Sequence, residues 1–514
     1  MRRYDSIIIG AGHNGLICAS YLARSGQKVL VLESSESLGG LASLSEFYPG
    51  FKTSIAHTVN HFSQKIANDL DLASHGFNSK SGSLPIVGLS IDGNHLVLKG
   101  NELSGVAPED SQAYGTYLDS MQRFADMLKP FWLKTVPRIG SNRLPELLSF
   151  ASLGLNLRLL GKDAMREFLR VFSLPMRDLM DENFDNDILK AMLSWDGLIG
   201  SKLAPRSPNN SVLALLYRMS GGQADAHQVT TEGVRGLISA LHSSAAAAGV
   251  EVRSGTSVHR IHVGENDAGL VATGVHLKDS EQIDADNIVS SADPQSTFLN
   301  LVGVEHLEIE FTNRIRRLRC DGYVAKLHLA LDDLPKFSGL TRPDGRMIIA
   351  PNLDAIEFAY DDAKYGDFSQ QPVMEIVIPS LQDKSLAPDG QHVLSANIMY
   401  VPYNLKKGWD KKAREDLCKL VIDVIERYAP DIRSHILYEE VLTPLDLEQI
   451  YGVTGGHWHH TEFALDQLFM MRPTFGAAQY STPISGLYLC GAGCHPGGGL
   501  MGGPGHNAAR EILR

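Results

Sequence analysis

The sequence predicts an α/β fold, and three observations carry that prediction. Residues 4–33 read as a strand, a glycine turn, a helix, a second strand and an acidic residue. The middle of the chain alternates helical and strand patterns. Residues 486–514 hold a strand, a glycine-rich turn and an amphipathic run. Strands that alternate with helices are typical of a mostly parallel sheet covered by helices.

The first unit of the fold is a nucleotide-binding pattern. The apolar strand 4–9 runs into the glycine turn 10–15, and a helical pattern follows to Ser25. A second strand, 28–32, ends on Glu33. This order of strand, glycine turn, helix, strand and acid is the dinucleotide-binding unit.

The glycines and the acid of this unit have separate mechanical roles. Gly10 permits the tight turn, Gly12 lets the backbone approach a pyrophosphate, and Gly15 lets the helix and strand pack closely. Free N–H groups at the start of the helix favour the phosphates. Glu33 is placed to accept hydrogen bonds from a ribose, and its charge disfavours a ribose 2′-phosphate.

Two further glycine segments point to FAD rather than NAD. Gly39 and Gly40 follow Glu33 by six residues, and the plain NAD unit has no such pair. Residues 486–514 contain a strand, then His-Pro-Gly-Gly-Gly, and eight of the residues 491–505 are glycine. Both segments resemble motifs of the phytoene desaturase-like and amine oxidase superfamily of FAD-dependent oxidoreductases. The pyridine nucleotide-disulfide oxidoreductase domain-containing proteins are the branch that the chain most resembles.

The resemblance implies how the cofactor is held. In this superfamily the second glycine pair lies along the pyrophosphate and ribityl chain, and a strand near Val258 touches the adenine through its backbone. The expected FAD-binding residues are Gly10, Gly12, Gly15, Glu33, Gly39, Gly40, Val258, Gly491, Gly493, Gly498, Gly499, Leu500 and Met501. A terminal helix that begins near Gly499 to Met501 would direct its positive end at the flavin.

The domain organisation is expected to be discontinuous. A Rossmann-like FAD-binding domain would comprise residues 1–84, 226–300 and 470–514. An α+β substrate domain would comprise residues 85–225, which look mostly helical, and residues 301–469, which mix strands and helices. At 514 residues the chain is long enough for two or more domains.

Composition limits the partners and the compartment. Hydrophobic residues are 43% and charged residues 21%, as in ordinary globular proteins. A net charge of −12 disfavours nucleic acid or an anionic membrane as the main partner. Five cysteines, an odd and small number, fit a reducing compartment, so we expect a cytoplasmic protein. No Cys-x-x-Cys occurs, which argues against electron transfer through a dithiol.

Membrane association is expected to be peripheral at most. Arg2 and Arg3 lead directly into the first strand, so no secretory signal is expected. No apolar run reaches the roughly 18–20 residues that cross a bilayer. Residues 144–160 are apolar but interrupted. They favour a buried helix of the substrate domain, and contact with a membrane surface is the alternative.

Candidate catalytic residues gather near the C-terminus. Residues 457–462 contain three histidines and a glutamate. Their spacing does not suit a metal site, because on a strand two of the histidines share a face while the third points away. The resemblance implies that His460 and Glu462 line the cavity facing the flavin and that His495 approaches the isoalloxazine ring. It places His57 and His61 near the flavin as well. For His460 and Glu462, hydrogen bonding to neighbouring loops is the alternative role, whereas His495 could steady the ring, contact the substrate or attach the flavin covalently.

Three functions agree with the sequence. The first is an FAD-dependent enzyme that dehydrogenates a largely apolar organic substrate, with a hydride passing to flavin N5 and with oxygen, a quinone or another acceptor reoxidising the flavin. The second is an amine or amino-acid oxidase that produces peroxide. The third is a non-enzymatic, flavin-holding regulatory protein. Substrate, acceptor, covalent attachment of the flavin and oligomeric state are open at this point.

Overall fold

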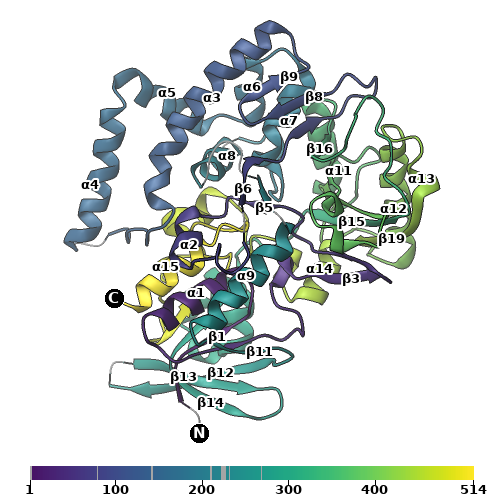
Figure 1. Ribbon diagram of the computed structural model, residues 1–514. Helices are drawn as coiled ribbons and strands as arrows, with labels where there is room; N and C mark the ends of the chain where they lie inside the picture. The colour runs from purple at the N-terminus through teal and green to yellow at the C-terminus, as the bar shows by residue number, and fades with distance from the viewer. Residues whose placement is uncertain are drawn as a thin grey trace.

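The computed structural model describes residues 3–77, 79–140, 143–208, 211–221, 227–230, 232–267 and 269–514. The predicted middle segment of the FAD domain, 226–300, therefore begins at a residue outside the described ones. Figure 1 shows the arrangement: one sheet near the two chain ends, a second sheet distant from them, and a group of helices above.

A seven-stranded sheet forms the first layer and draws its strands from three distant parts of the chain. Its order is β11-β2-β1-β14-β13-β12, and β20 pairs with β14. β1 runs parallel to β2 and β14, and β14 runs parallel to β20. The strands are β1 Arg3–Ile9, β2 Val29–Leu32, β11 Glu251–Arg253, β12 Val258–Asn266, β13 Gly269–Leu277, β14 Gln282–Ser290 and β20 Leu487–Leu489.

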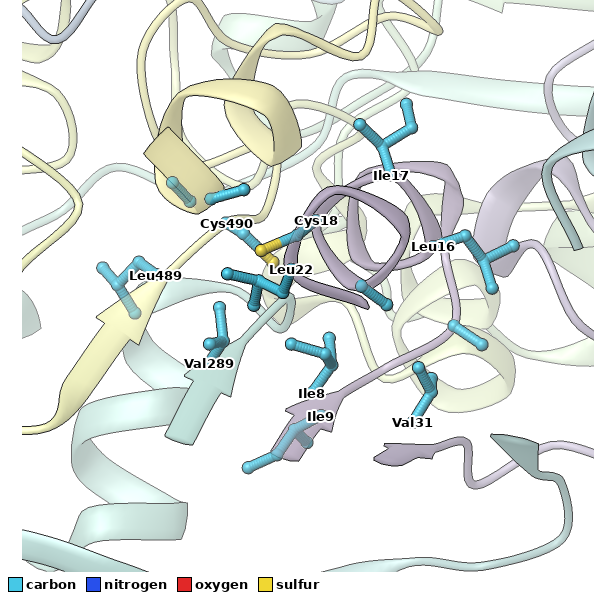
Figure 2. Close-up of a cluster of buried hydrophobic side chains, with 14 of the residues drawn as sticks. Ile8, Ile9, Leu16, Ile17, Cys18, Leu22, Val31, Val289, Leu489 and Cys490 are labelled. Atoms are coloured by element: carbon cyan, nitrogen blue, oxygen red, sulfur yellow. The ribbon is translucent and has the colours of Figure 1, made fainter. Parts of the chain in front are cut away.

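Three helices cover this sheet. α1 (His13–Arg24) packs against α9 (Gly233–Ala247) and α15 (Gly503–Ile512). Figure 2 shows Cys18 and Leu22 on the side of α1 that faces Val289 and Ile8 of the sheet, with the thiol of Cys18 beside that of Cys490. All five cysteines are buried and free. The parallel strands and the helices confirm the predicted α/β class with a Rossmann-like, discontinuous FAD-binding unit.

A second, eight-stranded sheet joins two separate parts of the predicted substrate domain. Its order is β19-β15-β18-β17-β16-β7-β8-β9, and only β16 and β7 pair in parallel. The three strands β7 to β9 come from the part that was predicted to be mostly helical. The strands are β7 Ile86–Gly88, β8 Leu96–Lys99, β9 Glu102–Ser104, β15 Val324–Leu331, β16 Arg346–Ile349, β17 Met374–Val377, β18 His392–Met399 and β19 Ile436–Leu442.

The two faces of this sheet differ in polarity because successive side chains of a strand point to opposite faces. One face is apolar: Leu327, Ile376 and Ala396 belong to a core that packs against α12 (Lys411–Glu426). The alternate positions on the same strands include Lys326 and Glu375. The second face therefore carries polar side chains, although Lys326 and Glu375 are both buried.

Residues 144–159 form a helix as predicted, but this helix, α4, is exposed rather than buried. The prediction of a buried helix over residues 144–160 is wrong, because Leu148 and Leu159 of α4 are 59% and 73% exposed. α4 stands apart from the body of the molecule in Figure 1. The helices of this region are α3 Pro108–Leu128, α4 Leu144–Leu159, α5 Lys162–Ser173, α6 Met176–Asn183, α7 Asp187–Leu198 and α8 Ser211–Ser220.

Smaller elements connect these layers. β5 and β6 form a three-stranded sheet with β10, and β3 pairs with β4. The remaining strands and helices are β3 Ser45–Tyr48, β4 Phe51–Thr53, β5 Val59–Asn60, β6 Ser79–Ser83, β10 His227–Thr230, α2 Gln64–Asp69, α10 Ile309–Arg316, α11 Leu353–Lys364, α13 Ile432–His435 and α14 Pro444–Tyr451.

Candidate functional site

One cavity of about 410 Å³ lies between the two sheets. Part of its wall comes from the glycine turn after β1, the end of β2 and the C-terminal glycine segment. The rest comes from the polar face of the second sheet, from α7 and α8, and from residues 451–460. The cavity therefore joins the predicted nucleotide site to the substrate domain.

The first glycine turn separates structural from ligand-facing positions. Gly10 has a φ of +95°, which favours glycine. A Cβ on Gly15 would lie 2.1 Å from the carbonyl oxygen of Gly10, so α1 needs this glycine to approach β1. Gly12 has an ordinary φ of −63°, and a Cβ there would meet no protein atom closer than 3.9 Å. The space beside Gly12 opens into the cavity, so a ligand can approach the protein backbone there.

Glu33 is fixed beside this turn. Its carboxylate accepts the N–H of Ala11 at 2.7 Å and the N–H of Ser35 at 2.9 Å. A carboxylate offers about four acceptor sites, so capacity remains for ribose hydroxyls. Glu33 lines the cavity as the sequence predicts.

Nine of the thirteen predicted cofactor residues line the cavity, and four lie behind it. Gly15, Gly491, Gly493 and Met501 are absent from the described wall. A Cβ on Gly491 would meet the Ser291 carbonyl oxygen at 2.4 Å, so this glycine permits close packing of two turns. The residues in the wall are Gly10, Gly12, Glu33, Gly39, Gly40, Val258, Gly498, Gly499 and Leu500.

The terminal helix begins later than the sequence suggests. α15 starts at Gly503, and its N-cap is Gly502. A start between Gly499 and Met501 is wrong, because the backbone there is bonded elsewhere: the Leu500 N–H donates to Asn60 Oδ1 at 2.8 Å. Gly497 and Gly499 have φ values of +119° and +102°, so this glycine segment turns beside the cavity and is not part of the helix.

Residues 457–460 form a buried loop on the cavity wall. Arg472 organises it, because its guanidinium donates to the carbonyls of His459 at 2.5 Å, Glu462 at 3.1 Å and Ala492 at 2.8 Å. His460 lines the cavity with a φ of +64°, and its Nδ1 has no hydrogen-bond partner. Burial lowers the pKa of His460 to about 4, so its imidazole is neutral at physiological pH.

The other two predicted catalytic residues lie outside the described wall of the cavity. Glu462 pairs with Arg319 at 2.6 Å. His495 is fully buried; its Nε2 bonds to the Phe131 carbonyl oxygen at 2.7 Å and its Nδ1 bonds to the Tyr217 hydroxyl at 3.0 Å. Both side chains bond neighbouring segments, which for Glu462 is the alternative role that the sequence left open.

A buried charged cluster, which we call the charged wall, forms the substrate-domain side of the cavity. It consists of Asp196, Arg218, Arg346, Glu375 and Asn397, with His57 and Lys326 bonded to it. Sheet register brings it together: Asn397 on β18 lies opposite Lys326 on β15 and Glu375 on β17. No local pattern in the sequence signals this cluster, because its members are far apart in the chain.

Arg346 is the centre of the charged wall. Its guanidinium bonds to Glu375 at 2.5 Å and to Asp196 at 2.6 Å, and it is 1% exposed. The cost of burying such ions exceeds what a purely structural role requires, so clusters of this kind mark functional sites.

His57 extends the charged wall toward the centre of the second sheet. Its Nε2–H donates to Glu375 at 3.0 Å, and its Nδ1 accepts from the Lys326 ammonium at 3.1 Å. Lys326 also donates to Asn397 Oδ1 at 2.7 Å. Burial lowers the pKa of Lys326 to about 7 and that of His57 to about 4. His61 lines the cavity together with His57.

Two absences concern the described residues only. Within these residues, which include the three clustered histidines of the 457–460 loop, no group of three or more His, Cys, Asp or Glu side chains could hold a metal ion. No helix in the described part of the chain is long and apolar enough to cross a membrane.

The residues present fit FAD. The N-cap Gly12 gives α1 no side-chain cap, so the first N–H groups of the helix are open to phosphate. Several buried polar atoms of cavity residues have no partner among the residues that the structure describes, as expected where a polar ligand completes the site. These atoms are His13 Nε2, Asn14 Oδ1, Trp458 Nε1, His459 Nδ1 and His460 Nδ1.

Comparison with known proteins agrees with this site. Residues 15–513 match the model of the flavin containing amine oxidoreductase family, and the chain belongs to that family. It is 34% identical to the mouse (Mus musculus) pyridine nucleotide-disulfide oxidoreductase domain-containing protein 2, over 99% of this chain and 93% of the relative. It is 26% identical to one of the limonene dehydrogenase polypeptides of Castellaniella defragrans, over 100% and 95% of the two chains.

The fold is also that of solved flavoenzymes. A putrescine oxidase variant superposes with a TM-score of 0.61 at 13% identity, over 99% of each chain. Family and fold together establish an FAD-dependent oxidoreductase. The family also confirms the resemblance drawn from the glycine motifs.

Proposed function

We propose that this chain is an FAD-dependent dehydrogenase of a largely apolar organic substrate. The single observation that carries the proposal is the cavity, which is continuous from the glycine turn at Gly12 to the substrate-domain wall. Ile55, Ile199 and Trp458 give that wall apolar surface. The limonene dehydrogenase relative, which aligns over the whole chain, is named for a dehydrogenase activity.

FAD, when bound, supplies a ring system that accepts a hydride equivalent from the substrate. The chain would hold it through Gly10, Gly12 and Glu33 at one end and through Gly499 and Leu500 at the other. The protein then has to position the substrate, exclude water and accept a proton. An external acceptor, oxygen or a quinone, would complete each cycle.

His460 is the residue we propose for the proton. Its neutral imidazole lines the cavity, and Nδ1 has no partner among the protein groups. Arg472 holds the loop through backbone carbonyls, including that of the preceding residue, His459. Glu462 and His495 lie behind the wall, so we assign them positions in the scaffold rather than contact with the substrate.

Anaerobic reduction of the holoprotein tests this function. Mixed with a panel of terpenes and other hydrocarbon-rich compounds, the enzyme should lose its visible flavin absorbance with at least one of them. Replacing His460 by Asn should slow that bleaching by about 100-fold or more. The matched control is His242→Asn, an exposed position on α9, which should bleach at the wild-type rate. Bleaching by amines alone, with peroxide released in air, would instead establish an amine oxidase.

We also propose that α4 rests on an anionic membrane surface. Its outward side is an apolar stripe, because Leu144, Leu148, Leu155 and Leu159 are all more than half exposed at helical spacing. The local charge differs from that of the whole chain: residues 129–170 contain eight Lys or Arg and three Asp or Glu, although the net charge is −12. Basic residues beside an apolar helix face are typical of peripheral binding to anionic lipid.

Vesicle sedimentation tests the membrane contact. Binding to vesicles with phosphatidylserine should exceed binding to phosphatidylcholine vesicles and should weaken with salt. Replacing Leu148 and Leu155 by Glu should abolish it without changing stability, because both side chains are exposed. Ile450→Glu, at an exposed position distant in sequence, is the control. Equal binding by all three proteins would refute the proposal.

A further inference from the structure

Arg218 is a cation of the charged wall that forms no ion pair with a carboxylate among the described residues, although the charges of Asp196 and Glu375 act on it from a distance. Its guanidinium donates to the backbone carbonyls of Asp196 and Ile199 and, at 3.1 Å, to His459 Nε2. By contrast, two carboxylates flank Arg346. Among the described residues, no Asp or Glu oxygen forms an ion pair with Arg218.

The end of α7 explains how Arg218 is held without such a partner. Asp196 lies in the last turn of α7, and Ile199 is its C-cap. The last carbonyl groups of a helix are unpaired and carry partial negative charge, which favours a cation. This support fixes the guanidinium in place, yet it neutralises the charge only in part.

Donor groups of Arg218 remain for a ligand. A guanidinium carries five N–H groups, and the three bonds described above use three of them. Arg218 lines the cavity and is half-buried, so it is accessible from the cavity side. Desolvation lowers the pKa of Arg218, which shows that keeping the cation there carries a free-energy penalty.

Two further donors lie beside Arg218. His459 Nε2 accepts from Arg218, so the neutral ring, whose pKa burial holds well below its usual value, carries its proton on Nδ1. That Nδ1–H has no partner, and neither has the indole N–H of Trp458. Gly200 packs against both rings, and its absent side chain keeps them close to α7. Both N–H groups are buried and His459 Nδ1 packs against Gly498, so the donor that this corner presents to the cavity is the guanidinium of Arg218.

We propose that Arg218 binds a carboxylate of the substrate, which makes the substrate an organic acid with an apolar body. A carboxylate is an acceptor-only group, and it matches the donors of a guanidinium. The neighbouring apolar side chains of Ile55 and Ile199 would contact the hydrocarbon part. This inference rests on the proposed function and narrows its substrate class.

The cofactor is a second source of anionic oxygens, so the experiment separates the two. Holoprotein is titrated by calorimetry with octanoate and with octanamide, which has the same length and no charge. The expected result is that octanoate binds about 10- to 100-fold more tightly. Arg218→Met should lose this preference and keep its FAD, while Arg218→Lys should retain part of the preference. Arg206→Met, at a half-exposed arginine paired with Asp354, is the matched control.

Each contrary outcome overturns the assignment. Equal affinity for octanoate and octanamide, or no binding of octanoate by wild-type holoprotein, would remove the carboxylate site. Loss of FAD from Arg218→Met with the preference intact would assign Arg218 to the cofactor. Because the titration measures binding without turnover, a failure of the dehydrogenase assay leaves its result intact, and the two proposals fail separately.

Discussion

Replacement by alanine should lower the stability of the protein at Gly15 and the affinity for FAD at Gly12, although the two glycines lie three residues apart. Gly15→Ala places a Cβ 2.1 Å from the Gly10 carbonyl oxygen, where real contacts stay beyond 3.0 Å. The helix must therefore move by about 1 Å against β1. Nine residues of α1 are buried, so this movement disturbs a packed core.

The cost follows from that movement. Overpacking of a core costs about 1–3 kcal/mol or more, and the helix propensity of Ala returns about 1 kcal/mol. We expect Gly15→Ala to lower the free energy of unfolding of the FAD-free protein by about 2 kcal/mol. Gly12→Ala meets no protein atom within 3.9 Å at an ordinary φ, so its stability should stay within about 0.5 kcal/mol of wild type.

The affinity for FAD should separate the two variants further. The methyl group of Gly12→Ala occupies cavity space that we assign to the pyrophosphate, so we expect FAD to bind at least about 10-fold more weakly. Urea unfolding of FAD-free protein and FAD titration measure the two effects. The control is Gly115→Ala on the exposed side of α3, which meets nothing within 4 Å; it should leave the FAD affinity unchanged and raise the free energy of unfolding by about 1 kcal/mol at most. The reasoning is refuted if Gly12→Ala keeps wild-type affinity or loses as much stability as Gly15→Ala.

Three further predictions concern charge and the terminal loop. Burial lowers the pKa of His13, His57 and His460 from 6.5 to about 4. Between these two pH values the unfolded chain binds more protons than the folded one, so the free energy of unfolding should fall as the pH drops from 6.5 to 4. Urea midpoints that do not change over this range of pH would contradict the prediction. Arg346→Met removes the guanidinium that bonds both Asp196 and the buried Glu375 and should cost about 3–5 kcal/mol in urea unfolding, and a loss below 1 kcal/mol would show that the two ion pairs are dispensable. Asn60→Ala removes the acceptor of the Leu500 N–H, so the affinity for FAD should fall by more, in free energy, than the stability of the fold. FAD titration and urea unfolding of the same variant measure these two changes, and an equal loss in both would contradict the prediction.

Local patterns explain what the sequence could predict. Gly10, Gly12 and Glu33 lie within one strand-helix-strand unit, where spacing along the chain determines position in space. β15 lies in the part of the chain where the sequence predicts strands mixed with helices, and apolar residues alternate there with Lys326 and His328. The discontinuous sheet followed from the family motifs, and the domain boundaries themselves stay predictions.

The charged wall, the surroundings of α4 and the direction of the His495 ring depend on contacts between residues that are far apart in the sequence, and no local pattern indicates such contacts. Arg218, Arg346 and Glu375 meet only because the order of strands in the second sheet and the end of α7 bring them together. The apolar sequence of a helix such as α4 indicates that its surface packs against something other than water, but it does not indicate which surface that is. His495 follows the right motif, yet its ring is turned toward Phe131 and Tyr217, and spacing along the chain does not set that direction.

The visible absorption spectrum of purified protein, taken before and after acid precipitation, tests the central claim most directly. If the glycine turn and the terminal glycine segment enclose one flavin, protein supplied with FAD should be yellow at one FAD per chain. The supernatant after precipitation would then show whether the flavin is released or covalently attached. Protein that stays colourless after FAD is supplied would contradict the assignment of the cavity.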